Sequence, residues 1–279
     1  MRRSNTRRVI VLDSLRLRGL EGVEHPYSVA PAVAWTEVEE LVGEAPPSAV
    51  VLLDPYAGPT PGELFPRLRD LLRRFPSLTV VAALELRGDR VGDLLTLLDW
   101  GVAEVIDAHT EATPRAIGAR LGQAHARPLK RRLQAALSSY VSTEAHAVLL
   151  AAAEVAVEGG GAPELARVLR APPRALAARF ARADLPPPRQ VQAWMRVLLA
   201  CLLLDDPGRT VYAAAYACGY STDRSLRRAV TELLGTDTTA LRRGGAFAHA
   251  ARAFDGLLAE LREAGRERRR AARMVPRPG

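Results

Sequence analysis

The pattern of apolar residues changes halfway along the chain, and this change limits the folds that the sequence can adopt. In the first half, short apolar runs alternate with amphipathic stretches, whereas from Leu129 onward the patterns are helical throughout. Continuous apolar runs that alternate with helices are typical of a parallel sheet covered on both faces. We therefore expect an open α/β domain over residues 8–123 and an all-helical region after it.

The expected sheet has five strands. A strand near Pro31–Trp35 is needed to complete it, although that segment has little strand character. The other four strands are apolar runs at Val9–Asp13, Val50–Asp54, Leu78–Leu84 and Val102–Ile106. The helical patterns between them lie at Glu37–Val42, Leu64–Arg74 and Val91–Trp100. This order predicts a flavodoxin-like parallel sheet.

The charge of the chain favours a polyanionic partner. The formal net charge is +8, which points to nucleic acid before a membrane surface. Lys130 is the one lysine among 39 basic residues, so a bias in the coding sequence accounts for many arginines, and their positions matter more than their number. No apolar run approaches the ~20 residues of a membrane span. Cys201 and Cys218 fit core positions in a reducing compartment, so we expect a cytoplasmic protein.

A helix-turn-helix pattern lies between Thr210 and Arg242. Thr210 can cap a first helix, Gly219 can end it, and Ser221 can cap a second helix that ends at Gly235. Two short helices joined by a turn with glycine are typical of this motif. The expected inward residues are Val211, Ala214, Ala215, Cys218, Leu226, Val230, Leu233 and Leu234, and the expected outward ones are Asp223, Arg224, Arg227 and Arg228. Arginines near the start of such a helix can pair with guanine in a major groove.

The pattern recurs about 50 residues earlier. Leu165, Val168 and Leu169 make one apolar face, and Pro172–Pro173 opens a second helix. Leu176 and Phe180 precede Leu226 and Val230 by 50 residues each. Val191–Leu204 would connect the two copies as a long helix. Two units on one connector can enter major-groove segments about 34 Å apart.

These residues carry a family resemblance. The run Val211–Tyr220, followed by Leu226, Arg228, Gly235 and Arg242, resembles the signature of AraC-type transcriptional regulators. Leu165 to Phe180 resembles that family's first helix-turn-helix, and the resemblance covers Ser142–Arg243. It implies double-stranded DNA as the partner and assigns DNA contacts by position. The implied contacts are Pro173, Arg174, Ala177 and Ala178 in the first unit, and Asp223, Arg224, Ser225 and Arg228 in the second.

The sequence departs from that family pattern in both units. Arg170 stands in the first turn, where glycine is usual, and Ala177 and Ala178 deprive the first recognition helix of polar groups. Thr238 replaces the usual proline and Leu241 the usual aromatic residue. We therefore expect specificity to depend mainly on the second unit.

The first half resembles the receiver domain of bacterial response regulators. Asp54 ends the third expected strand in sequence order, where that family places its phosphate-accepting aspartate, and Gly62 lies eight residues later. Asp13 is the single carboxylate available after the first strand for Mg²⁺. No hydroxyl follows the Leu78–Leu84 run, and Ala108 stands where a receiver has lysine, with His109 beside it. The resemblance therefore implies a degenerate receiver domain, in which Asp54 is either a structural carboxylate or a phospho-acceptor.

The remaining features indicate neither an enzyme nor a cofactor. The five histidines are scattered, and no nucleophile or metal-ligand constellation is visible. The run Arg266–Arg270 is either a solvated helix end or a contact to DNA phosphates. An apolar stripe over Phe247–Leu261 either packs on its own domain or pairs two protomers.

We therefore predict a two-domain DNA-binding transcriptional regulator, bacterial and response-regulator-like. Its parts are a receiver-like domain (1–125), a helical linker (126–141), an AraC-like DNA-binding domain (142–245) and a basic C-terminal helix with a tail (246–279). The receiver-like domain would meet a regulatory protein or an unknown signal. The alternative is a protein-interaction adaptor whose helical module binds DNA nonspecifically or not at all.

Overall fold

The computed structural model describes residues 6–12, 17, 19–24 and 26–274 and divides into two compact units. The first unit contains residues 1–128 together with 205–213. The second contains residues 129–204 and 214–279. A short stretch of the helical half is therefore part of the α/β unit.

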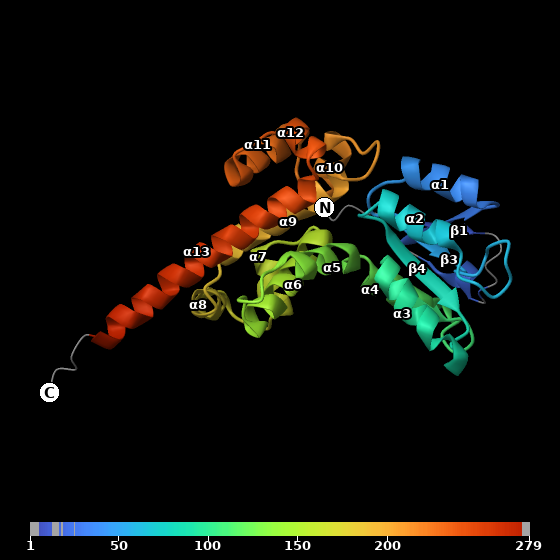
Figure 1. Cartoon of the computed structure of the whole chain (residues 1–279), viewed down its shortest axis with the longest axis horizontal. Helices are drawn as coiled ribbons and strands as arrows, with labels where there is room; N and C mark the ends of the chain where they lie inside the picture. The colour runs from blue at the N-terminus through green and yellow to red at the C-terminus, as the bar shows by residue number, and fades with distance from the viewer. Residues whose placement is uncertain (1–5, 13–16, 18, 25, 275–279) are drawn as a thin grey trace. The chain divides into compact units, whose positions relative to one another are not determined.

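The first unit is built on a five-stranded parallel sheet in the order β2-β1-β3-β4-β5 (Figure 1). This is the strand order of flavodoxin-like doubly wound sheets, so the predicted fold class is confirmed. The strands are β1 (Arg7–Leu12), β2 (Tyr27–Ala32), β3 (Val50–Leu53), β4 (Thr79–Leu84) and β5 (Glu104–Asp107).

The position predicted for the second strand was wrong. The strand lies at Tyr27–Ala32, and Trp35 begins a helix instead of ending a strand. β2 pairs with β1 and lies at the edge of the sheet, and most of its residues are partly or fully exposed. An edge strand does not need a continuous apolar run and tolerates Pro31, which explains its poor sequence signal.

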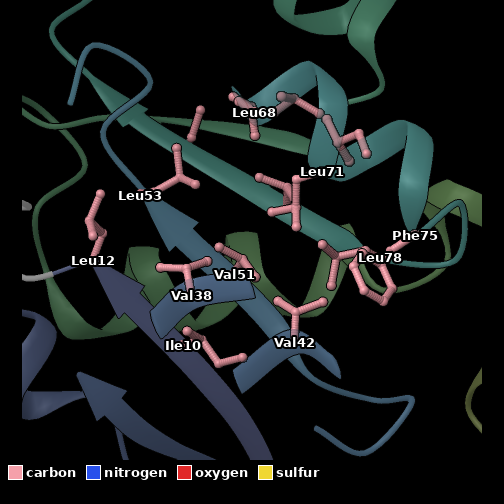
Figure 2. Close-up of a cluster of buried hydrophobic side chains, with 14 of the residues drawn as sticks. Ile10, Leu12, Val38, Val42, Val51, Leu53, Leu68, Leu71, Phe75 and Leu78 are labelled. Carbon is pink, nitrogen blue, oxygen red and sulfur yellow. The ribbon is translucent and has the colours of Figure 1, made fainter. Parts of the chain in front are cut away.

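Side chains alternate between the two faces of the sheet. Ile10 and Leu12 point to a core shared with α1 (Trp35–Glu44), α2 (Pro66–Arg74) and α3 (Val91–Trp100), part of which Figure 2 shows. Val9 and Val11 point to the opposite face, which packs against α4 (Pro114–Ala124). This two-residue period is what a strand buried on both faces requires.

The described residues between β1 and β2 contain one short helical element. This element is a 3-10 turn, η1 (Leu20–Gly22), and Leu17 is buried beside α4 in the same core. A second 3-10 turn, η2 (Gly88–Arg90), leads into α3. One face of the sheet is therefore covered by three helices, and the other by α4 with this connection.

Residues 205–213 join the first unit through a buried polar contact. The Asp206 carboxylate accepts hydrogen bonds from the Ser77 amide (3.1 Å) and the Ser77 hydroxyl (2.5 Å). Arg209 donates to the Ala45 carbonyl at 2.7 Å and lies 3.5 Å from Asp206. Burial raises the pKa of Asp206 from its ordinary value, while the donors from Ser77 oppose that rise.

All regular elements after β5 are helical in the described part of the chain. These helices, apart from α4, are α5 (Arg127–Ala136), α6 (Thr143–Val157), α7 (Ala162–Val168), α8 (Pro173–Arg182), α9 (Pro188–Leu204), α10 (Val211–Ala217), α11 (Asp223–Leu234), α12 (Thr238–Arg243) and α13 (Ala246–Met274). In the part of the chain that the structure describes, every helix is too short or too polar to cross a bilayer.

The centre of the second unit is α9, which packs against α6 and α13 (Figure 1). The rings of Trp194 and Phe254 lie 5.2 Å apart between α9 and α13. The buried part of the apolar stripe of α13 therefore packs on its own unit. Cys201 and Cys218 are buried free thiols, as predicted.

Candidate nucleic-acid interface

The second helix-turn-helix consists of α10 and α11. The Thr210 hydroxyl accepts a hydrogen bond from the Ala213 amide at 3.0 Å, which confirms the predicted cap. After α10, Gly219 has a φ of 76°, and the Tyr220 amide donates to the Ala215 carbonyl at 2.9 Å. A residue in this left-handed conformation ends the helix, as the glycine in the sequence indicated.

The predicted cap of α11 was off by one residue. Thr222, not Ser221, caps the helix, and its hydroxyl accepts a hydrogen bond from the Ser225 amide at 3.1 Å. The Ser225 hydroxyl reciprocates by donating to the Thr222 carbonyl at 2.6 Å. Ser221 is exposed and lies in the turn. Both residues are good caps, so the length of the turn, which sequence did not reveal, decides between them.

The first helix-turn-helix consists of α7 and α8 and repeats the same geometry. Arg170 has a φ of 49°, and the Ala171 amide donates to the Ala166 carbonyl at 3.0 Å. Leu176 and Phe180 are buried, as are their counterparts Leu226 and Val230. The duplication inferred from the sequence is therefore present in the structure.

One residue of the predicted apolar face of α7, Val168, is exposed instead of buried. Leu165 is fully buried, but 54% of Val168 is exposed. α7 ends at Val168, so the side chain lies at the last turn of a seven-residue helix, beyond the packing with α8 and α9. The expectation for Val168 was wrong.

The exposed face of α11 carries two arginines one turn apart. The side chain of Arg228 is 80% exposed, and its Nε lies 2.7 Å from Glu232 on the same helix. Arg224 is exposed and has no ion-pair partner among the described residues. Residues four apart lie on the same side of a helix, so the two guanidinium groups form one basic stripe.

The other predicted residues of α11 are engaged in local contacts. Arg227 Nη1 donates to the Thr238 hydroxyl of α12 at 3.0 Å, and its Nε lies 3.6 Å from Asp223. Ser225 is used in the cap. The structure therefore separates the predicted set into an outward pair, Arg224 and the Glu232-paired Arg228, and a group that stabilises α11 and its contact with α12.

The exposed face of α8 is poor in hydrogen-bonding groups. Pro173 is its first residue, and Arg174 beside it is exposed without an ion-pair partner among the described residues. Ala177 and Ala178 are also exposed. Arg179 contacts Glu144 of α6 at 2.8 Å, which holds α8 in place. Arg174 is thus the one polar side chain that the predicted contact set contributes from α8.

A second polar cluster lies in the first unit, at the carboxyl ends of the strands. Asp54 follows β3, and its Oδ1 accepts from the Tyr56 amide at 2.9 Å. The Tyr56 hydroxyl donates to Asp93 at 2.7 Å, and Arg90 lies 4.0 Å from the centre of the tyrosine ring. Burial and the Asp93 bond raise the pKa of Tyr56 to about 12. Nothing in the sequence pattern indicated this cluster, which joins the loop after β3 to η2 and α3.

Asp107 occupies the end of β5 in the same region. Its carboxylate accepts from the Thr110 hydroxyl (2.6 Å) and the His109 amide (3.0 Å), and the Thr110 bond lowers the pKa of Asp107. Ala108 comes next, so no lysine follows this strand. Asp13, the candidate Mg²⁺ ligand, lies outside the described residues. Among the residues described, no group of three His, Cys, Asp or Glu side chains could hold a metal ion.

Comparison with known proteins supports the helical assignment. A family model described as a helix-turn-helix domain, of AraC type, matches residues 165–244, from α7 to the end of α12. No curated protein and no solved structure matches the chain. The chain therefore contains a helix-turn-helix domain, and this domain includes both recognition helices.

Proposed function

We propose that this chain is a sequence-specific, DNA-binding transcriptional regulator of AraC type that reads DNA chiefly through Arg224 and Arg228. The observation that carries the proposal is the exposed pair of arginines on α11, in a domain that has two copies of the motif. Arginine can pair in bidentate fashion with guanine O6 and N7 in the major groove. α11 is held by a cap, a left-handed glycine and α12, so these side chains project from a rigid helix.

The first helix-turn-helix, α7 with α8, would contribute less to base recognition. Arg174 is the polar group that α8 offers among the predicted contacts, and alanines expose only methyl groups to the groove. The alanines can contact a thymine methyl, and Arg174 is the one residue of this set that could contact a guanine or a phosphate. We infer that α8 mainly orients the domain on DNA.

The α/β unit would act as a pseudo-receiver that responds to a regulatory protein or another signal. Its strand order supports this reading. A receiver needs a cation beside its phosphate, but β5 ends at Asp107, and Ala108 and His109 follow it instead of a lysine. A second anion at this edge would disfavour a phosphate there. Asp54 is therefore proposed as a structural carboxylate, and the function that we propose involves no catalysis.

Selection of binding sites from random double-stranded DNA by the full chain tests the proposal. We expect an enriched motif with two parts whose centres lie about one helical turn apart. Failure to enrich any motif, with binding that depends steeply on salt, would overturn sequence-specific recognition. That second outcome would favour the alternative function, an adaptor or a nonspecific DNA binder. The exposed alanines of α8 are the observation that supports this alternative.

A further inference from the structure

The C-terminal helix α13 reaches the end of the first recognition helix. Asp184 follows α8, and its carboxylate is held by both terminal nitrogens of Arg269, at 3.0 and 2.8 Å. Gly265 is buried at the same place, where an added Cβ would lie 2.1 Å from an Asp184 oxygen. A side chain at residue 265 would force the Asp184 carboxylate to move, so glycine at this position leaves room for the Asp184–Arg269 ion pair.

Arg266 and Arg270 flank this contact and are exposed. Neither has an acidic partner within the described part of the chain. They are four residues apart and therefore share one side of the helix, whereas Arg268 lies about 200° around it from Arg266. Each lies at most three residues from Arg269, or about 4.5 Å along the helix axis.

The last part of α13 is an exposed, arginine-rich stretch of helix. After Gly265, the residues up to Ala271 are exposed, and α13 continues to Met274 (Figure 1). Five of the residues from Arg262 to Arg270 are arginine and two are glutamate. Asp184 neutralises Arg269, which leaves a basic surface beside α8.

We propose that Arg266 and Arg270 form a third DNA contact, which binds backbone phosphates next to the segment occupied by α8. This inference rests on the proposed function, because it requires the helix-turn-helix domain to be on DNA. Phosphate contacts position a protein without reading bases. A contact of that kind would supply, beside α8, the polar interactions that Ala177 and Ala178 cannot make. The surface lies beyond residue 244, where the helix-turn-helix match ends.

The salt dependence of binding reports the number of phosphate contacts. Each neutralised phosphate contributes about 0.9 to the slope of log K against log salt concentration. Loss of two contacts should therefore reduce the magnitude of the slope by about 2. The loss of affinity should be similar on a selected site and on a random duplex, because phosphates carry no sequence information.

The experiment compares Arg266→Gln/Arg270→Gln with the wild-type full chain on both DNAs over a range of salt concentrations. Glutamine removes the charge and keeps a good helix propensity. One control is Arg268→Gln on the opposite side of α13. A second is Arg67→Gln/Arg73→Gln on α2, which removes two exposed charges from the other unit. Circular dichroism and thermal unfolding establish that each variant is folded.

We expect the slope to fall by about 2 for the Arg266/Arg270 variant, and to change little for Arg268→Gln or the α2 variant. An unchanged slope, or an equal fall in the α2 control, would overturn the inference. So would a loss confined to the selected site. These outcomes leave the proposed function intact if the wild-type chain still binds its selected motif, whereas a wild-type chain that binds no DNA would reject the proposed function itself.

Discussion

Arg170 and Gly219 occupy equivalent turns of the two helix-turn-helix units and share the left-handed backbone conformation, with φ values of 49° and 76°. The turns differ in length by one residue, because Pro173 begins α8 three residues after Arg170, whereas Asp223 begins α11 four residues after Gly219. An L-residue with a side chain is strained in this region, and glycine is not. The first helix-turn-helix therefore keeps the left-handed turn of the motif at a conformational cost.

Substitutions at these two positions should have opposite effects. Both residues belong to the second compact unit of the chain, which contains residues 129–204 and 214–279. We expect Arg170→Gly to stabilise this compact unit by about 0.5–1 kcal/mol and Gly219→Ala to destabilise it by about 1 kcal/mol. No atom lies within 4 Å of a Cβ built on Gly219, so strain and not collision would cause the loss. Denaturant unfolding of the two variants measures both. A destabilised Arg170→Gly variant would show that the arginine side chain makes a contact that outweighs its strain.

The contact between Asp206 and Ser77 should hold residues 205–213 in the first unit. Asp206→Ala would leave two partly buried donors of Ser77 and the Arg209 guanidinium without this acceptor, at a cost of about 3–5 kcal/mol. Ser77→Ala removes one hydrogen bond and should cost about 1 kcal/mol. Hydrogen exchange in β4 and α2 reports the stability of this unit. The control Asp70→Ala alters an exposed carboxylate and should change little. Equal effects of Asp206→Ala and Asp70→Ala would contradict the account.

His125 should make the first unit sensitive to acid. Burial, with a smaller effect of the Arg7 charge, lowers the pKa of His125 to about 3, so the folded unit keeps the ring neutral. Between the unfolded value near 6.5 and the folded one, the unfolded chain binds a proton that the folded chain does not. The free energy of unfolding should therefore keep its full value above pH 6.5 and fall by about 1.4 kcal/mol per pH unit below it. Unfolding measured from pH 7.5 to 5 should show this fall in the wild type and a smaller one in His125→Leu. Parallel curves would contradict a buried neutral histidine.

Asp54 should not accept a phosphoryl group from a small phosphodonor. The expected result after incubation with acetyl phosphate and Mg²⁺ is an unchanged intact mass, because no lysine follows β5 and Asp107 adds negative charge at the same edge of the sheet. A gain equal to one phosphoryl group that disappears in Asp54→Asn would overturn the pseudo-receiver proposal. A phosphorylatable receiver protein treated in parallel shows that the donor is active.

Periodicity was enough to predict most of the fold. Buried strands such as β3 and β4 consist almost entirely of continuous apolar residues, and α13 begins at residue 246, where the C-terminal helix was predicted to begin. The edge strand β2 was misplaced because only one of its sides is paired. Local rules also found the caps and turns of the second helix-turn-helix to within one residue.

Contacts between distant residues were beyond the reach of those rules. The bond from Arg227 to Thr238 depends on how α12 packs against α11, and the sequence alone gives Arg227 the same outward position as Arg228. The contact of Asp206 with Ser77 joins residues 129 positions apart. No local periodicity specifies such a pair, because it depends on the tertiary packing of the unit.

The binding of Arg224→Ala and Arg228→Ala to the selected DNA site tests the central claim most directly, with Arg227→Ala as the matched control on the same helix. Each of the two variants should lose about 1–3 kcal/mol of binding free energy on that site and lose its preference for one base position. Arg227→Ala should keep the base preference, because its guanidinium contacts Thr238 and Asp223. Full affinity and unchanged base preference in both Arg224→Ala and Arg228→Ala would contradict the assignment of α11 as the helix that reads DNA.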